Sequence, residues 1–284
     1  MGVYKSHNAD LLFLACALAR IGAVPAMLAP FLEWETVTVM MDRLRPAHFV
    51  TDAAKFAESG STATGCAPSC RPRCWRAAGP PTCPRSRTPR RASAPVPRHP
   101  RRRPALITHT SGTTGVPKMV AAARRGTQLP INMQARLARW LRYSETYAMC
   151  ISFVHSRTFA ALATALELGI GIAALTDADV DNVREIFLEC RPGGVEAHPN
   201  MYPHWEELAD DPRKPLANVR IFMSTFDAIH PRSIRVMLGA SERRWPIFLQ
   251  SYGQTETGPV TMRLYTRRNI RRADGRCVGH PSSA

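Results

Sequence analysis

The 284-residue sequence has no uninterrupted apolar run of the roughly 18 residues that a membrane-spanning helix needs. Residues 11–19 form an apolar stretch that could be mistaken for the hydrophobic part of a signal peptide. Asn8 and Asp10 stand before this stretch as helix-capping residues, and Arg20 and Gly22 follow it as at a helix end. We therefore expect a buried helix in a protein without a membrane span.

Residues 60–104 lack acidic residues and lysine, and Val96 is their only Ile, Leu, Met, Val or Phe. The tract contains eleven arginines and ten prolines. Such a segment cannot bury enough apolar surface to offset the entropy lost on ordering, so we predict that it is disordered. It could be an arginine-rich tail that binds nucleic acid, a proline-rich linker, or the product of a shifted reading frame in GC-rich DNA. The last interpretation is favoured, and a nucleic-acid partner is disfavoured.

The basic character of the chain is local. The tract carries +11 of the net charge of +16, which leaves +5 for the other 239 residues. Half of the cysteines lie in the same tract, but their spacing with the nearby His99 matches no common zinc motif: Cys66, Cys70, Cys74 and Cys83. The other four are typical of small buried residues in a reducing compartment, and hence of a cytoplasmic protein: Cys16, Cys150, Cys190 and Cys277.

Helical and strand patterns alternate on both sides of the tract. Helices are predicted at residues 9–20, 33–44, 128–143, 156–168, 179–190, 203–210 and 231–239. Strands are predicted at residues 23–28, 48–51, 105–108, 147–153, 170–175, 195–198, 219–223, 247–250 and 260–265. This alternation indicates an α/β fold with a parallel sheet. We expect an N-terminal α/β piece at 1–59, the disordered tract at 60–104 and an α/β core at 105–284.

A loop with many hydroxyl groups and two glycines follows the strand at 105–108. Gly112 and Gly115 would let backbone N–H groups turn closely around an anion, and Lys118 adds a positive charge suited to phosphate oxygens. The loop is not a Walker A motif, because Lys118 does not follow a glycine. An ordinary surface loop is the alternative. The hydroxyl residues that would supply further donors are Thr110, Ser111, Thr113 and Thr114.

A second motif, Tyr-Gly-Gln-Thr-Glu at residues 252–256, follows the strand at 247–250. Ligands of open α/β sheets bind at such carboxyl ends of strands. Tyr252 offers an aromatic face, Thr255 a hydroxyl, and Glu256 a hard oxygen ligand for Mg²⁺. A plain turn between strands would explain Gly253 but not the whole string.

Together the two motifs resemble those of the adenylate-forming (AMP-binding) superfamily, which includes acyl-CoA synthetases, luciferases and the adenylation domains of peptide synthetases. The resemblance covers residues 1–58 and 104–284. It implies the layered parallel-sheet core of the family's large N-terminal domain. It also implies activation of a carboxylic acid, such as a fatty acid, by ATP and Mg²⁺, followed by transfer to CoA.

The resemblance assigns roles to individual residues. The loop residues from Thr110 to Gly115, with Lys118, would bind the β- and γ-phosphates of ATP. Tyr252 would face the adenine, while Gly253 and Gln254 shape the turn. Thr255 would bind the α-phosphate and Glu256 the Mg²⁺. Lys118, Thr255 and Glu256 are thus the expected catalytic residues.

Three further assignments are weaker, because each has a structural alternative. His155 aligns with the family's residue beside the acyl carboxylate, although a lone histidine after a strand is more often structural. Asp227 would contact the adenine amino group, but the family's usual glycine-rich segment is replaced by Ser-Thr-Phe-Asp-Ala at 224–228. Pro199 and Tyr202 match a substrate-pocket motif of the family, with core packing as an equal alternative.

In the family the chain continues to an aspartate that binds the ribose, a hinge arginine and a small C-terminal lid domain with a lysine that drives adenylation. We expect these parts to be absent, and therefore expect residual nucleotide binding with little turnover and no CoA transfer. The alternatives are a non-catalytic ATP/AMP-binding module and a nucleic-acid binder acting through the tract. The acid, the acceptor and the oligomeric state are not predicted.

Overall fold

The structure is a computed structural model that describes residues 1–59, 103–112, 115–272, 274 and 276–281. The tract predicted to be disordered, with its cysteines, therefore lies outside the described residues except for its last two positions. The chain forms two compact units, and each is considered by itself. The first contains Met1–Arg125 with Phe153–His155, and the second contains Gly126–Ser152 with Ser156–Ala284.

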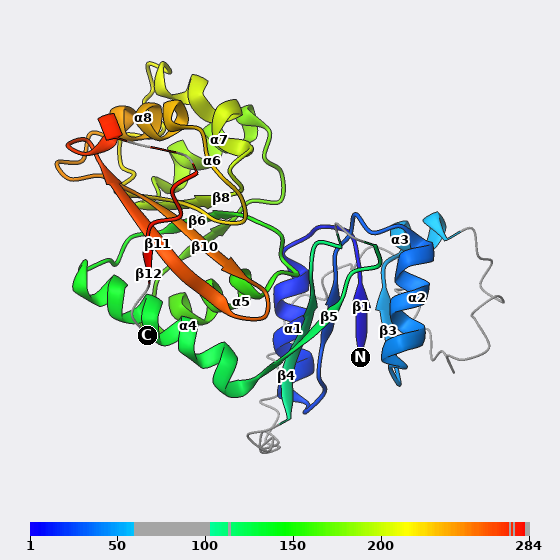
Figure 1. Cartoon of the computed structure of the whole chain (residues 1–284). Helices are drawn as coiled ribbons and strands as arrows, with labels where there is room; N and C mark the ends of the chain where they lie inside the picture. The colour runs from blue at the N-terminus through cyan, green and yellow to red at the C-terminus, as the bar shows by residue number, and fades with distance from the viewer. Residues whose placement is uncertain (60–102, 113–114, 273, 275, 282–284) are drawn as a thin grey trace, which may run out of the picture. The chain divides into compact units, whose positions relative to one another are not determined.

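A five-stranded sheet forms the first unit, drawn from blue to green in Figure 1. All of its neighbouring strands are parallel except the last pair. Its helices are α1 (Asp10–Arg20), α2 (Trp34–Leu44) and α3 (Ala53–Glu58). In spatial order the strands are β3 (Phe49–Thr51), β1 (Gly2–Tyr4), β2 (Ala26–Leu28), β4 (Pro104–His109) and β5 (Met119–Ala123).

The helices of the first unit follow the apolar spacing of the sequence. The four buried residues of α1 recur at helical spacing, on the side that faces the core: Leu11, Leu12, Ala15 and Leu18. The helix begins at Asp10, whose N–H donates to Asn8 Oδ1 at 3.3 Å. It ends before Gly22, which has φ of 81° and donates to the Ala19 carbonyl.

A seven-stranded sheet forms the second unit, drawn from green to red in Figure 1. Strands β7, β6, β8, β9 and β10 run parallel to one another, and β11 and β12 are antiparallel additions at one edge. In spatial order they are β12 (His280–Pro281), β11 (Gly258–Thr266), β10 (Ile247–Gln254), β9 (Ile221–Ser224), β8 (Gly194–Ala197), β6 (Tyr147–Cys150) and β7 (Ile172–Ala174).

Helices cover both faces of this sheet. On one face α6 (Val180–Cys190), α7 (Met201–His204), the 3₁₀ helix η1 (Trp205–Ala209) and α8 (Pro231–Ala240) pack on a core that includes Phe222 and Phe248. On the other face lie α4 (Arg124–Trp140) and α5 (Ser156–Leu168). A short 3₁₀ helix, η2 (Ile270–Arg272), follows β11.

This layered architecture confirms the predicted α/β class. Several element ends differ from the prediction. The strand β6 stops at Cys150 rather than continuing to 153, and β10 extends to Gln254 because it pairs with β11. Helix α8 passes through Gly239, which was expected to end it. Cys16, expected to be buried, is exposed on α1.

The contacts group β4 and β5 with the first unit rather than with the core predicted at 105–284. The predicted domain boundaries stay a prediction. Across the described ranges, no helix is both long enough and apolar enough to cross a membrane.

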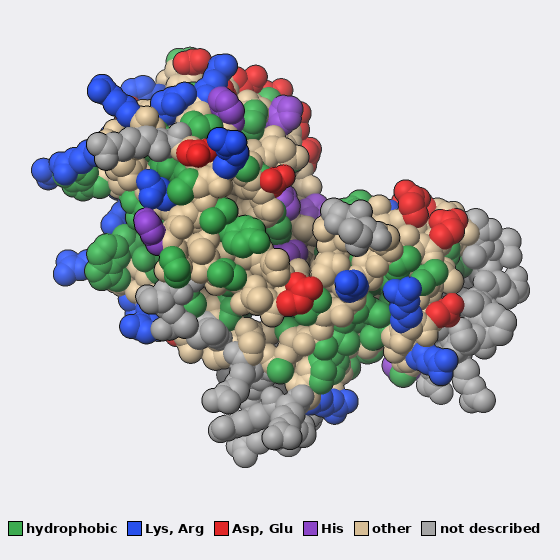
Figure 2. Space-filling view, viewed as in Figure 1, with side chains coloured by type: hydrophobic (Ala, Val, Ile, Leu, Met, Phe, Trp, Pro, Cys, Tyr) green, Lys and Arg blue, Asp and Glu red, His purple; other side chains and the backbone are tan. Residues whose placement is uncertain are grey.

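Basic side chains gather beside α8 on the second unit (Figure 2). Here the exposed Trp245 ring is flanked by two guanidinium groups, with Arg244 and Arg268 at 5.4 and 4.9 Å from the ring centroid. Trp245 precedes β10, so this patch lies at the amino end of that strand, opposite the end that carries Tyr252.

Candidate functional site

The predicted phosphate loop is the connection of the β4–β5 hairpin. Thr110 and Lys118 close it, because the Thr110 N–H donates to the Lys118 carbonyl at 3.0 Å and the Lys118 N–H donates to Thr110 Oγ1 at 3.1 Å. Ser111 and Lys118 are exposed. Val116 packs against the core beneath the loop. The hairpin thus presents the Lys118 ammonium group to solvent from a fixed base.

Both glycines of this loop have a conformation that favours glycine. Gly112 has φ of 73°, and a Cβ atom there would lie 2.6 Å from Pro117 Cγ and 2.9 Å from the Gly115 carbonyl oxygen. Gly115 has φ of 131° and donates its N–H to the Gly112 carbonyl at 3.1 Å. Thr113 and Thr114, between them, lie outside the described residues. At the two described positions the backbone therefore needs glycine, as the composition predicted.

His109 joins this loop to the neighbouring strand, and the sequence analysis missed it. Its Nε2 accepts the Ala29 N–H at 2.9 Å, and its Nδ1 lies 2.8 Å from the Thr110 carbonyl oxygen. Because Nε2 accepts, the proton is on Nδ1, and the ring is neutral. Burial lowers the pKa of His109 below its ordinary value of 6.5 and outweighs the bond to Thr110. A histidine at the end of a strand, directly before the loop, was the only signal.

The second motif occupies the turn of the β10–β11 hairpin in the second unit. Tyr252, Gly253 and Gln254 end β10, and Thr255 and Glu256 lie in the turn. Tyr252 is 46% exposed. Glu256 is also exposed.

Gly253 is required by the close approach of the two strands. A Cβ atom there would lie 2.2 Å from the Gly258 carbonyl oxygen, and the register shifts between Tyr252 and Gly253. This irregularity turns the end of β10 away from regular pairing. The motif is therefore both a structural turn and the bearer of the predicted ligand groups.

The segment that replaces the family's glycine-rich run follows β9. Phe226 has φ of 84°, an uncommon conformation for an aromatic residue, and its ring lies 4.4 Å from that of His198 between centroids. Asp227 is exposed, and its Oδ1 accepts the Ala228 N–H at 2.7 Å. Tyr202, for which a pocket role and core packing were equal alternatives, is fully buried in the core, and its hydroxyl donates to the Met223 carbonyl.

The parallel strands bring several of the predicted residues to one edge of the second sheet. Cys150, Ala197, Ser224 and Gln250 share a register row across β6, β8, β9 and β10. Asp227 and the motif at 252–256 follow from this row. Burial raises the pKa of the Cys150 thiol to about 12, so this cysteine is not a nucleophile.

The phosphate loop, by contrast, belongs to the first unit. His155 is half-buried in the segment between β6 and α5, in the part that is grouped with the first unit. The predicted site residues therefore come from both units. Their assembly into one site stays a prediction.

A buried ion pair lies between the second sheet and its α4–α5 layer, and sequence reasoning missed it. Arg157 in α5 donates from Nε to Glu196 Oε1 at 2.8 Å and from Nη2 to Glu196 Oε2 at 2.7 Å. Tyr147 donates its hydroxyl to Glu196 Oε2 at 2.8 Å. Burial lowers the pKa of Arg157, but attraction to Glu196 outweighs it and the net shift is upward. Burial, with the nearby Glu196 charge, raises the pKa of Tyr147.

The donors present suit a nucleotide with Mg²⁺. In the described residues no three His, Cys, Asp or Glu side chains are grouped so that they could hold a metal alone. Mg²⁺ is commonly bound by one or two carboxylates together with substrate phosphates and waters, which the single exposed carboxylate of Glu256 fits. Glycine-rich backbone and a lysine in the loop fit the phosphates.

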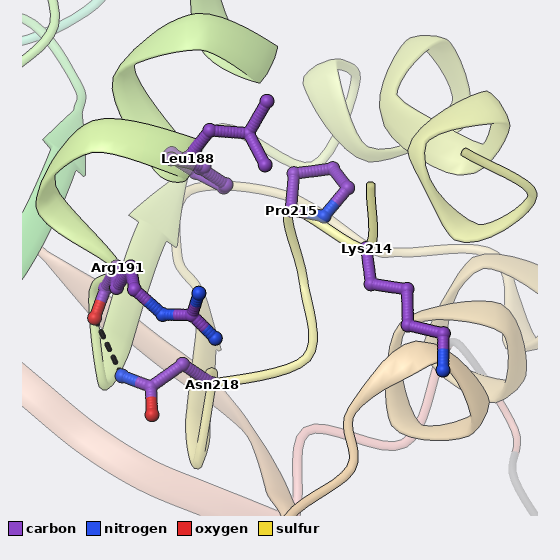
Figure 3. Close-up of a pocket in the computed structure, with 6 residues that line it drawn as sticks. Leu188, Arg191, Lys214, Pro215 and Asn218 are labelled. Atoms are coloured by element: carbon purple, nitrogen blue, oxygen red, sulfur yellow. Dashed lines mark hydrogen bonds between the residues drawn. The ribbon is translucent and has the colours of Figure 1, made fainter. Parts of the chain in front are cut away.

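The hollow drawn in Figure 3 is unrelated to these motifs. It is a shallow hollow lined by Phe187, Leu188, Arg191, Lys214, Pro215 and Asn218. Asn218 Nδ2 donates to the Arg191 carbonyl, and these residues precede β9 and β8. The hollow is thus at the amino ends of the strands, opposite the predicted site.

Two characterised proteins are similar in sequence. A 3-amino-2-hydroxy-4-methoxybenzoate diazotase from Streptomyces cremeus is 42% identical over 304 residues, covering 99% of this chain and 55% of the relative. A 3-aminoavenalumate diazotase from a Streptomyces species is 26% identical over 306 residues, covering 100% of this chain and 50% of the relative. The chain therefore spans about half the length of these relatives.

Solved structures share the fold. An O-succinylbenzoate coenzyme A synthetase from Bacillus subtilis, in complex with ATP and magnesium ion, superposes with a TM-score of 0.71 at 14% identity, covering 99% of this chain and 54% of that one. A malonyl-CoA ligase with methylmalonyl-CoA and AMP bound gives 0.68 at 19% identity, with 92% and 53% covered.

The family model described as "AMP-binding enzyme" matches residues 1–283. This match spans both units and both motifs, and it agrees with the fold of the solved structures. The resemblance seen in the sequence is confirmed: the chain belongs to the family of AMP-binding, adenylate-forming enzymes.

Proposed function

We propose that this chain binds ATP with Mg²⁺ and supplies the nucleotide-binding part of an enzyme that activates a small acid as its adenylate. The observation that carries the proposal is the pair of motifs, each in a turn that requires its glycines: Gly112 and Gly115 through their positive φ angles, and Gly253 through the close approach of the partner strand. A cytoplasmic location, where ATP is abundant, belongs to the same proposal.

Each motif residue has a role in this reaction. The loop amides and hydroxyls of Thr110 to Gly115 and the ammonium group of Lys118 hold the β- and γ-phosphates. Tyr252 stacks on the adenine and Asp227 accepts from its amino group. Thr255 donates to the α-phosphate, and His155 lies beside the acid. Glu256 would hold the Mg²⁺, which neutralises phosphate charge when bound.

The chemical step needs little covalent participation by the protein. An oxygen of the acid attacks the α-phosphorus, the bond from that phosphorus to the β-phosphate oxygen breaks, and pyrophosphate leaves. Both reactants are anions, so the cationic and N–H groups stabilise the transition state by charge. Lys118 acts at the oxygens of the β- and γ-phosphates, and Thr255 acts at those of the α-phosphate.

For the substrate, we favour diazotase-type chemistry on an aromatic amine that carries a carboxylate, because the 42% identical relative is a diazotase of an aminobenzoate. An arylamine supplies one nitrogen of a diazo group, so the second must come from an inorganic nitrogen acid such as nitrite. Adenylation turns one nitrite oxygen into a leaving group carried away on AMP. The amine nitrogen then bonds to the nitrite nitrogen, and the other nitrite oxygen leaves as water with the two amine protons.

Acyl-CoA formation is the second candidate, because several of the similar structures are of coenzyme A ligases. Here a carboxylic acid, such as a fatty acid, is adenylated, and the CoA thiol displaces AMP. The chain spans about half the length of the two diazotase relatives. The activity of a whole protein of that length is therefore part of either proposal.

Pyrophosphate exchange into ATP distinguishes these functions. We expect exchange that depends on nitrite, and a diazo product from 3-aminobenzoate that is trapped as a coloured azo dye by an electron-rich naphthol. Exchange that depends on a carboxylic acid, with a CoA thioester as product, would favour the second candidate. Absence of ATP binding would contradict both.

A further inference from the structure

We infer that Arg157, held in place by Glu196, binds the ring carboxylate of an aromatic amino-acid substrate, the group that diazotisation leaves unchanged. This inference rests on the proposed diazotase-type function and names how its substrate is selected. It assigns a binding role to a cluster defined by Arg157, Glu196, Tyr147, Gln134 and Thr225.

The cluster lies on the site side of the second sheet. Arg157 is in the first turn of α5, which follows the carboxyl end of β6, and Glu196 is the third of four residues in β8. Thr225 comes directly after β9, two residues before Asp227. In open α/β sheets this edge is where ligands bind.

The guanidinium group is fixed from several elements. Its Nε and Nη2 donate to the two oxygens of the Glu196 carboxylate, in a bidentate fork. Its Nη1 donates to Gln134 Oε1 of α4 at 2.5 Å. Glu196 also accepts from the Tyr147 hydroxyl and, at 3.4 Å, from the Thr225 hydroxyl. Such a pre-organised cation loses little entropy when it binds an anion.

A contribution to the stability of the fold does not by itself explain why the Arg157–Glu196 ion pair is buried. Removing two charges from water is costly, so a buried ion pair is often no more stable than apolar residues of similar volume. The side chain of Glu196 is 0% exposed, whereas that of Arg157 is 15% exposed. Of the two side chains, only that of Arg157 reaches the surface.

A carboxylate is the matching ligand, because a guanidinium group binds it through charge-assisted hydrogen bonds. An aromatic surface is close by in the chain: Phe226 follows Thr225 and its side chain is 43% exposed. Phe226 also holds an unfavourable φ of 84°, and such strain is concentrated at functional sites. A ring carrying a carboxylate fits these two features.

Binding of 3-aminobenzoate, aniline and ATP by calorimetry tests the inference. The double variant Arg157→Met/Glu196→Gln removes both charges and should fold. We expect it to bind 3-aminobenzoate at least tenfold more weakly, with the affinities for aniline and ATP unchanged. Arg157→Lys keeps the charge but loses the fork, and should also weaken 3-aminobenzoate binding. Arg139→Gln, which breaks the exposed α4–α5 pair Arg139–Glu167, is the matched control and should change nothing.

Equal 3-aminobenzoate affinity in the wild type and in whichever of the Arg157 variants folds would overturn the inference, as would a wild-type chain that does not distinguish 3-aminobenzoate from aniline. A chain that binds 3-aminobenzoate through Arg157 but does not bind ATP would contradict the proposed function while leaving the carboxylate site standing. The two failures are therefore distinct.

Discussion

At the scale of single residues, His109 stabilises the start of the predicted phosphate loop through two hydrogen bonds. It links the Ala29 N–H of the first unit to the Thr110 carbonyl, and the bond in which Nε2 accepts the Ala29 N–H requires the neutral ring with its proton on Nδ1. Protonation would place a second N–H against the Ala29 N–H. The loop should therefore lose this support in acid.

The pH dependence of stability tests this arrangement. Because burial lowers the pKa of His109 below 6.5, its stabilising contribution is full above the unfolded pKa of 6.5 and is lost as the pH falls through the folded value. On going from about pH 7.5 to 5.5, we expect the wild type to lose on the order of 1 kcal/mol more unfolding free energy than His109→Gln. Parallel pH profiles from thermal melts of the two proteins would refute the role.

Lys118 is predicted to act on the ligand and not on the fold. Its ammonium group is exposed, and only its backbone takes part in closing the loop. Lys118→Ala should weaken ATP binding by roughly tenfold, about 1.5 kcal/mol, with an unchanged melting temperature. Lys214→Ala, which removes an exposed lysine paired with Glu242, is the control and should leave ATP affinity as it is. Calorimetric titration with ATP measures both, and equal affinities would contradict the phosphate role.

At the scale of elements, the β10–β11 hairpin determines where the second motif stands. Gly253 lets the strands approach so closely that any Cβ would clash with the Gly258 carbonyl. The turn that follows carries Thr255 and Glu256. The motif's glycine is thus explained by packing, whereas the ligand roles of its polar residues stay a prediction.

Replacing this glycine should damage the element. We expect Gly253→Ala to lower the free energy of unfolding by about 1–3 kcal/mol, because backbone must move to admit the methyl group. Gly239→Ala is the matched control: no atom lies within 4 Å of its Cβ position in α8, and alanine favours a helix by up to about 1 kcal/mol. Urea denaturation compares the two. A Gly253→Ala protein as stable as the wild type would show that the hairpin adapts.

The helices and the long-range contacts show which features of the structure could be predicted from the sequence. Apolar periodicity and helix-ending residues placed α5 at its observed bounds and gave α6 its cap, Asp179, whose side chain accepts the Asp181 N–H. The motifs identified the family. The Arg157–Glu196 pair was not predicted, because its residues are 39 apart and meet only once the sheet is formed. His109 was missed for the same reason: its partner Ala29 is 80 residues away.

At the scale of the whole molecule, charge is concentrated in one tract. Residues 60–104 hold +11 of the total of +16, so we expect attraction to polyanions to come from that tract and not from the two folded units. We expect weak duplex DNA binding that falls steeply between roughly 50 and 200 mM salt and does not depend on base sequence. Replacement of its eleven arginines by glutamine should abolish this binding and leave ATP affinity unchanged. Sequence-selective binding in a fluorescence anisotropy titration would instead favour a nucleic-acid function.

ATP binding by this chain is the most direct test of the central proposal. A calorimetric titration with Mg²⁺ present should show saturable binding of one ATP per chain, weakened by Lys118→Ala and by Glu256→Ala. The effect of Glu256→Ala should shrink when Mg²⁺ is omitted, because its carboxylate acts through the metal. Absence of saturable binding, or binding that neither substitution alters, would contradict the proposal that these two motifs form a working nucleotide site.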